Sequence, residues 1–177
     1  MAGISLADTA KVEKWLLRMD GSSTIQGNGA GIVVTSPHGE DLEFAVKFGF
    51  KASNNEPEYE ALLMGMKMAH EAGARHLVAY SDSQLVIKQV EGTYEGKEES
   101  MIQYLLQIVE LKMSFESFQL TEIPKKENIK ADCLSGACQI FRKFLDETYY
   151  HTISPQAKSS SNDPSNLLCR RSENTCG

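Results

Sequence analysis

Short apolar and alternating segments open the chain and predict a run of β-strands. Residues 14–20 are mainly apolar and lead into a stretch rich in Gly and Ser, which predicts a strand that ends at a turn. A β-branched run at 32–35 predicts a second strand, and alternation over 41–48 predicts a third. Because residues 37–40 favour a hairpin turn, we expect these three strands to form an antiparallel meander.

The hydrophobic period becomes helical after residue 55. Apolar side chains recur at helical spacing from Ala61 to Ala69, behind Asn55 and Pro57, which resemble a helix cap and an early-turn proline. The later segments predict a buried strand at 76–80, a helix at 83–91, a charged linker at 91–100, a helix through Met113, a strand at 115–123 and a closing helix at 127–147. The order βββ-α-β-α-α-β-α predicts an α/β fold: a mixed sheet with helices on its faces.

Length and composition predict one globular domain with two appendages. The chain has 177 residues and is 41% hydrophobic, enough to bury a core. We expect an N-terminal extension at 1–13, the domain at 14–147 and a disordered tail at 148–177, because the end of the chain is rich in Ser, Asn and Pro and lacks periodicity.

Several bulk properties restrict where the protein acts. No apolar run approaches the roughly 20 residues of a membrane span, and no secretory signal is apparent. The four cysteines lack C-x-x-C spacing and are typical of reduced thiols. We therefore expect an intracellular protein, cytoplasmic or nuclear, that is neither secreted nor bound to a membrane. The formal charge of −6 argues against binding nucleic acid by bulk electrostatics, so any such contact must be local.

Four carboxylates occupy polar positions where predicted strands end or helices begin: Asp20, Glu58, Asp82 and Asp132. Functional side chains of mixed sheets gather at such positions. Converging acids repel one another unless a cation neutralises them, and a set of Asp and Glu without His or Cys suits Mg²⁺ or Mn²⁺ rather than zinc. The first hypothesis is metal-assisted phosphoryl chemistry.

Each of these carboxylates has an ordinary structural alternative. Asp20 is compatible with a simple turn residue, Asp82 with a helix cap, and Asp132 with a charge that complements a helix dipole. Glu58 has acidic neighbours at Glu56 and Glu60. The spacing from 54–55 selects Glu58, with Glu60 as the second choice.

Five motifs together carry a family resemblance: Met19-Asp20-Gly21-Ser22, 29–33 (GAGIV), Asn54-Asn55-x-x-Glu58-Tyr59, 80–86 (YSDSQLV) and Asn128-x-x-Ala131-Asp132-x-Leu134. In this order they make residues 14–145 resemble the type 1 ribonuclease H family, and more closely the ribonuclease H domains of plant retroelement polyproteins and their stand-alone relatives. The resemblance implies a ribonuclease H-like fold with a five-stranded mixed sheet. It also implies endonucleolytic hydrolysis of the RNA strand of RNA–DNA hybrids.

The resemblance further implies a role for each matching position. Asp20 would bridge two Mg²⁺ (or Mn²⁺) ions about 4 Å apart, Glu58 and Asp82 would complete one site, and Asp132 the other. Gly21, Ser22 and Ser23 would approach the nucleic-acid backbone near the scissile phosphate. Hydrogen bonds in the minor groove, where the 2′-hydroxyl marks RNA, would come from Ser53, Asn54, Asn55 and Gln84.

The chain departs from some family members in three places. The loop at 123–128 has no His, the linker at 91–100 is acidic rather than a basic protrusion, and Gly136 interrupts the closing helix. These departures leave a second hypothesis open, a nucleic-acid-binding module with weak or no turnover; a third is a related nuclease with another substrate. We expect a monomer, either part of a retroelement polyprotein or an independent gene product.

Overall fold

The computed structural model describes residues 11–25, 27–48, 55–92, 99–137 and 168–170. In chain order its elements are β1 (Lys14–Thr24), β2 (Gly27–Thr35), β3 (Asp41–Phe48), α1 (Glu56–Glu71), β4 (His76–Ser81), α2 (Gln84–Val90), α3 (Glu99–Lys112), β5 (Ser117–Glu122), the 3₁₀ turn η1 (Lys125–Glu127), α4 (Ile129–Ala137) and β6 (Leu168–Arg170). The order of elements up to α4 is the one that the hydrophobic pattern predicts. Within the described segments, no helix is long and apolar enough to cross a bilayer.

The five strands β1 to β5 form the predicted mixed sheet, in the order β5-β4-β1-β2-β3. β1, β2 and β3 form the expected antiparallel meander, whereas β4 is parallel to both β1 and β5. β1 is therefore the central strand. β1 and β4 run in the same direction, and Arg18 pairs with Tyr80, so Asp20 and Asp82 each follow two residues after this pair on neighbouring segments.

A sixth short strand, β6, pairs antiparallel with β3. It lies within the segment 148–177 that the composition predicts to be disordered, so for these three residues the structure differs from the prediction. The outer edge of β3 offers unpaired backbone groups that another extended segment can satisfy. The rest of this segment, and most of the predicted extension at 1–13, lie outside the described residues.

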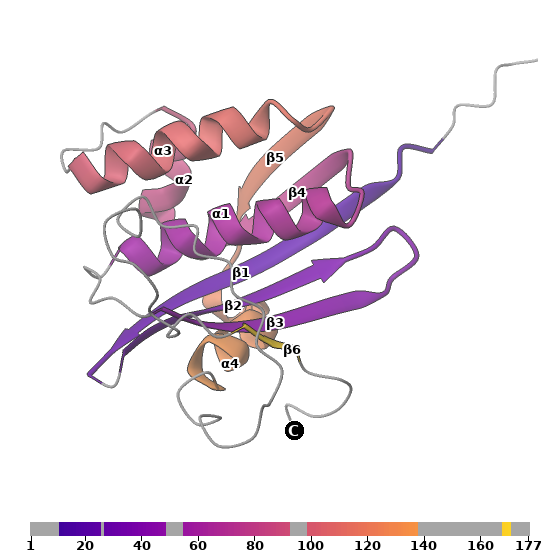
Figure 1. Ribbon diagram of the computed structural model, residues 1–177. Coiled ribbons are helices and arrows are strands. Elements are labelled where there is room, and N and C mark those ends of the chain that lie inside the picture. The colour runs from indigo at the N-terminus through magenta and orange to yellow at the C-terminus, as the bar shows by residue number, and fades with distance from the viewer. Residues whose placement is uncertain (1–10, 26, 49–54, 93–98, 138–167, 171–177) are drawn as a thin grey trace, which may run out of the picture.

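Helices cover the two faces of the sheet unequally (Figure 1). α1 lies on one face, where Leu62, Leu63 and Met66 are fully buried in the main core with Leu17 and Met19 of β1. α4 lies on the other face, where Leu134 forms a small cluster with Val33 and Ala45. The main core therefore belongs to α1, and α4 has a much smaller apolar contact.

Several predicted boundaries differ in the structure. β2 begins at Gly27 rather than at residue 32. β1 does not turn after Asp20 but continues to Thr24, because residues 21–24 pair with residues 27–30 of β2. Cross-strand pairing thus overrides the turn preference of Gly and Ser. α4 begins at Ile129 after the 3₁₀ turn, rather than at residue 127, and the predicted continuation from 138 to 147 lies outside the described residues.

Candidate active site

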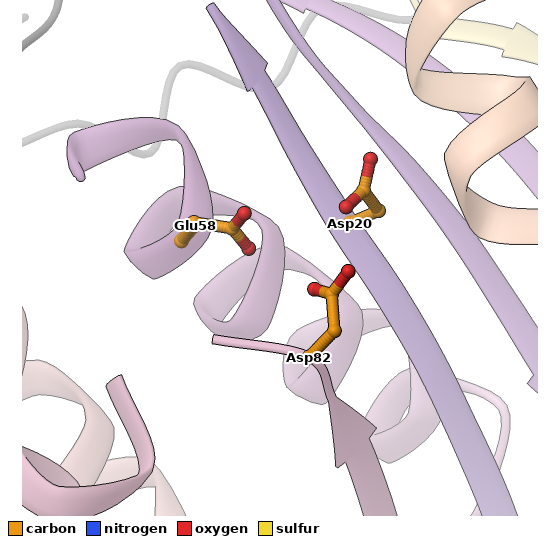
Figure 2. A group of neighbouring side chains, drawn as sticks. All are labelled: Asp20, Glu58 and Asp82. Carbon is orange, nitrogen blue, oxygen red and sulfur yellow. The ribbon is translucent and has the colours of Figure 1, made fainter. Parts of the chain in front are cut away.

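Three of the four predicted carboxylates converge at one edge of the sheet. Asp20 comes from β1, Glu58 from the first turn of α1 and Asp82 from the segment directly after β4, and Figure 2 shows the three side chains pointing toward one another. One carboxylate oxygen from each lies within 4.8 Å of the others. We call Asp20, Glu58 and Asp82 the acidic trio.

A glycine allows α1 to approach β1 closely enough to build the trio. A Cβ atom at Gly21 would lie 2.4 Å from the carbonyl carbon of Pro57 and 2.5 Å from the backbone nitrogen of Glu58, so no side chain fits there. The Gly21 N–H donates a hydrogen bond to Oε2 of Glu58 at 3.2 Å. Gly21 therefore fixes both the helix and the carboxylate against the strand.

The structure also distinguishes Glu58 from its acidic neighbour. Glu60 is 2% exposed and lies inside the core, where Tyr104 of α3 donates a hydrogen bond to its Oε1 at 2.7 Å. Glu58 points instead to Asp20 and Asp82. The spacing argument that prefers Glu58 over Glu60 agrees with this geometry.

Asp82 is not used as a helix cap. The N-cap of α2 is Ser83, whose hydroxyl accepts a hydrogen bond from the Val86 N–H at 3.4 Å. This frees the Asp82 carboxylate for the trio.

Burial and mutual repulsion make the charged form of the trio costly. Burial, followed by the charge of Asp20, raises the pKa of Glu58 to about 8, although the Gly21 N–H opposes the rise. Burial also raises the pKa of Asp20 to about 6, with added repulsion from Asp82 and Asp132, while a hydrogen bond from Ser135 lowers it. Such a cluster of desolvated, repelling acids is the environment that a bound cation stabilises.

The fourth predicted carboxylate lies beside the trio and not within it. Asp132 is in the first turn of α4, and its Oδ1 lies 3.3 Å from Nζ of Lys125 in an exposed ion pair. Its charge still acts on Asp20, whose pKa it raises. The structure therefore brings three predicted carboxylates together and places the fourth nearby with a lysine partner.

Polar contacts join α4 to β1 around Asp20, and two of the residues that make them are not site candidates in the sequence. Asn128 is fully buried, and its Nδ2 donates to the Met19 carbonyl at 2.9 Å. The Ser135 hydroxyl lies 2.5 Å from Oδ2 of Asp20. The hint in the sequence is that Ser135 lies three residues after Asp132. The contact itself could not be predicted, because it depends on how α4 crosses the sheet.

The predicted substrate-contacting residues are partly described. Asn55 is exposed and makes no capping hydrogen bond with its side chain, although Pro57 does occupy the first turn of α1 as predicted. Gln84 is exposed and donates from Nε2 to Oε1 of Glu122 at 2.7 Å. Ser22 donates from its hydroxyl to the Ser135 carbonyl at 3.1 Å, and Ser23 is exposed. Ser53 and Asn54 lie outside the described residues.

Comparison with known proteins places this site in a family. Residues 18–138 match the model of the reverse transcriptase-like family. The ribonuclease HI of Halobacterium salinarum is 31% identical over 86 residues, which are 49% of this chain and 43% of that protein. The bifunctional protein Rv2228c of Mycobacterium tuberculosis is 28% identical over 126 residues, or 70% of this chain and 35% of that protein. The chain thus spans less than half the length of these curated relatives.

Solved structures agree with the sequence relatives. The crystal structure of ribonuclease H1 from Halobacterium salinarum superposes with a TM-score of 0.67 at 27% identity and covers 71% of this chain and 96% of that chain. A ribonuclease H1 from compost, crystallised with an RNA/DNA hybrid, superposes with a TM-score of 0.63 at 26% identity and covers 69% and 94%. The chain belongs to the reverse transcriptase-like family, and these relatives and solved structures support its membership of the type 1 ribonuclease H family.

Proposed function

We propose that this protein hydrolyses the RNA strand of RNA–DNA hybrids, with divalent cations held by Asp20, Glu58, Asp82 and Asp132. The observation that carries the proposal is the acidic trio, whose oxygens lie within 4.8 Å of one another. The relative crystallised with an RNA/DNA hybrid supports the substrate class.

The residues present fit a hard divalent cation. Every candidate ligand is a carboxylate oxygen, which suits Mg²⁺ or Mn²⁺. Burial and, to a smaller degree, repulsion between the acids raise the pKa values of Asp20 and Glu58, so their ionised forms are costly without a cation. When bound, a pair of such ions would supply the activation of a water for attack on the phosphate and the stabilisation of the leaving oxygen.

Different residues would have different roles in holding the cations. Asp20 is grouped with Glu58 and Asp82 and also contacts Ser135 of α4, which makes it the candidate that would serve both ions. Gly21 holds Glu58 in place through its N–H. Asp132 would complete the second ion site. To do so, its carboxylate would leave the ion pair with Lys125 and bind the cation instead.

Recognition of the hybrid is proposed to be local. Asn55 and Gln84 are exposed amides near the trio, and together with Ser53 and Asn54 they would donate and accept hydrogen bonds in the minor groove. Gly21, Ser22 and Ser23 would lie near the scissile phosphate. Since the chain carries a net charge of −6, binding should be modest and sensitive to salt.

A second candidate function is a binding module with little or no turnover. Two specific observations favour it. Asp132 is paired with Lys125 rather than grouped with the trio, and residues 123–128 contain no His to assist proton transfer or product release. Such a module would bind the hybrid without cleaving it.

The deciding experiment incubates a labelled RNA–DNA hybrid with the protein and Mg²⁺ or Mn²⁺. The variant Asp82→Asn removes one trio charge and leaves the Ser83 cap intact. The matched control is Asp41→Asn, because Asp41 is an acid of similar type that is bound by Lys130 and Thr35, outside the trio. RNA cleavage by the wild type and Asp41→Asn, but not by Asp82→Asn, supports the nuclease.

Other results of the same assay point elsewhere. Hybrid binding without cleavage by the wild type supports the binding module. Cleavage of RNA–RNA or DNA–DNA duplexes with equal efficiency contradicts the proposed substrate class.

The proposed assembly is a monomer, acting either as part of a retroelement polyprotein or as an independent gene product. Size-exclusion chromatography with light scattering tests the first part of this proposal. A mass of twice 19.6 kDa would contradict it.

A further inference from the structure

Ser135 makes a buried contact with the central carboxylate of the site. Its side chain is 1% exposed, and its Oγ lies 2.5 Å from Oδ2 of Asp20 and 2.9 Å from the carbonyl oxygen of Asp132. A serine hydroxyl carries one proton and can donate it to only one acceptor at a time. An ionised carboxylate is the stronger acceptor, and the shorter distance is also the one to Asp20.

The rest of α4 holds Ser135 in this position. A Cβ atom at Gly31 of β2 would lie 1.9 Å from the Ala131 carbonyl oxygen and 2.6 Å from the Ser135 nitrogen, so α4 rests directly on the strand backbone. The Ser22 hydroxyl donates to the Ser135 carbonyl at 3.1 Å, and Asn128 donates to the Met19 carbonyl at 2.9 Å. These contacts flank the Ser135–Asp20 hydrogen bond at both ends and leave the serine little freedom.

We propose that Ser135 is a positioning residue for Asp20 in cation binding and catalysis. Its hydroxyl engages one carboxylate oxygen of Asp20 and thereby fixes the plane of the carboxylate, so that the other oxygen is presented to Glu58 and Asp82. This proposal rests on the proposed function, because it assumes that the trio holds a cation. Partners that orient a metal ligand typically contribute 10- to 100-fold to metal affinity or activity.

A purely structural role for Ser135 makes a different prediction. Serine side chains inside helices often donate back to a carbonyl in the preceding turn, which satisfies the hydroxyl without any functional consequence. Ser114, in the turn that follows α3, makes the same kind of bond away from the trio, because its hydroxyl donates to the Leu111 carbonyl at 2.6 Å. If Ser135 acted only in this way, its loss would change stability and leave cation affinity unchanged.

The test measures Mn²⁺ affinity by isothermal titration calorimetry on the full chain, well below the Tm of each protein. The variants are Ser135→Ala, Ser135→Thr, which retains a hydroxyl, and the control Ser114→Ala. We expect Mn²⁺ to bind Ser135→Ala about 10-fold more weakly or worse than the wild type. Ser135→Thr should recover most of the affinity, and Ser114→Ala should match the wild type.

The same proteins are then assayed for cleavage of the hybrid. We expect Ser135→Ala to lower kcat while the KM for the hybrid stays near the wild-type value, because Ser135 contacts Asp20 and is only 1% exposed. If Ser135→Thr does not fold, the Mn²⁺ affinity of Ser135→Ala alone tests the positioning role.

Wild-type Mn²⁺ affinity in Ser135→Ala, with only a lower Tm, would overturn the positioning role. A wild-type protein that binds Mn²⁺ but does not cleave the hybrid would contradict the nuclease proposal, while the affinity difference would still support the role of Ser135. A wild-type protein that binds no Mn²⁺ would overturn both.

Discussion

The helices α1 and α4 each supply one candidate acid, but they attach to the sheet by different means. α1 is 16 residues long, most of its residues are buried, and its apolar side chains, among them Leu62, Leu63 and Met66, belong to the main core. The described part of α4 is 9 residues long. It is held by one small apolar cluster, a contact on the Gly31 backbone, a few hydrogen bonds to β1 and the ion pairs of Lys130 with Asp41 and Glu43 of β3. Accordingly, Glu58 is already grouped with Asp20 and Asp82, whereas Asp132 is half-exposed and paired with a lysine.

This difference suggests a division between a preformed and an adjustable half of the site. Apolar packing fixes a helix strongly because many small contacts must be lost together. Polar contacts such as those of α4 are fewer and directional. The trio should therefore be assembled before any cation arrives, and completion of the site should depend on α4.

The largest expected effect comes from Gly21→Ala, which would disrupt the contact between α1 and β1. The new methyl group would overlap the backbone of Pro57 and Glu58, which cannot move aside as a flexible side chain can. Displacement of Glu58 by about 1 Å is enough to reduce cleavage about 100-fold. Mn²⁺ affinity and hybrid cleavage should fall together, measured by calorimetry and the cleavage assay.

Gly136→Ala is the matched control for this substitution. A Cβ atom at Gly136 meets nothing within 4 Å, and alanine is favoured over glycine in a helix by about 1 kcal/mol. Gly136→Ala should keep full activity with an unchanged or higher Tm. Wild-type activity in Gly21→Ala would show that the close approach of α1 is not needed.

Gly31→Ala would disrupt the packing of α4 against β2 and should show whether the trio binds a cation independently of α4. The methyl group would overlap the Ala131 carbonyl, and overpacking of this kind typically costs about 1–3 kcal/mol of stability. Because the trio does not include α4, Mn²⁺ binding should weaken only to the extent seen in Ser135→Ala, while cleavage is lost. Complete loss of Mn²⁺ binding in a folded Gly31→Ala protein would contradict the separation.

The preformed trio should impose a pH dependence on stability. The folded-state pKa values of Asp20 and Glu58 are raised from 3.8 to about 6 and from 4.5 to about 8, so in that range the folded state binds more protons than the unfolded state. Their contribution to stability is therefore present below about pH 4 and is lost as the pH rises toward 8. Each group contributes at most about 1.4 kcal/mol per pH unit.

Thermal denaturation of the wild type in EDTA should show a Tm that falls as the pH rises across this range. The variant Glu58→Gln cannot ionise and should flatten the upper part of the curve, and Mg²⁺ should restore the Tm of the wild type at high pH. Parallel curves for the wild type and Glu58→Gln would show that Glu58 ionises as readily in the folded state as in the unfolded state.

The smallest effect is expected from Lys125→Ala. The Lys125–Asp132 ion pair is exposed on both sides, and such pairs contribute about 1 kcal/mol or less. The variant should leave the Tm almost unchanged and frees Asp132 for a cation. A large drop in Tm by calorimetry would indicate that this pair, rather than packing on Gly31, holds the start of α4.

The sequence predicts the order of the elements along the chain, the antiparallel meander and the grouping of Asp20, Glu58 and Asp82, because each depends on local pattern and on motifs in fixed order. It predicts the end of β1 wrongly, since Gly21, Ser22 and Ser23 favour turns in isolation and only their pairing with β2 extends the strand. The motif residue Asn128 and the helix residue Ser135 gain their contacts from the way α4 crosses β1.

The same reasoning applies to the two glycines that shape the site. Gly21 and Gly31 appear in the motifs, yet their common property is that a helix backbone lies against each of them, which no spacing along the chain reveals. Close approach between segments that are distant in sequence is a tertiary property, so sequence patterns indicate where a glycine is and not what it contacts.

The central place of β1 in the sheet has a consequence for motion. β1 pairs with β2 from Leu16 to Thr24 and with β4 from Lys14 to Arg18, whereas Asp82 directly follows the last paired residue of β4. Amide hydrogens in central strands exchange with solvent only when most of the sheet opens, while those at strand ends exchange by local fraying. Asp20 should therefore remain fixed over the lifetime of the folded state, and the slower fluctuations of the site should arise in Asp82 and α4.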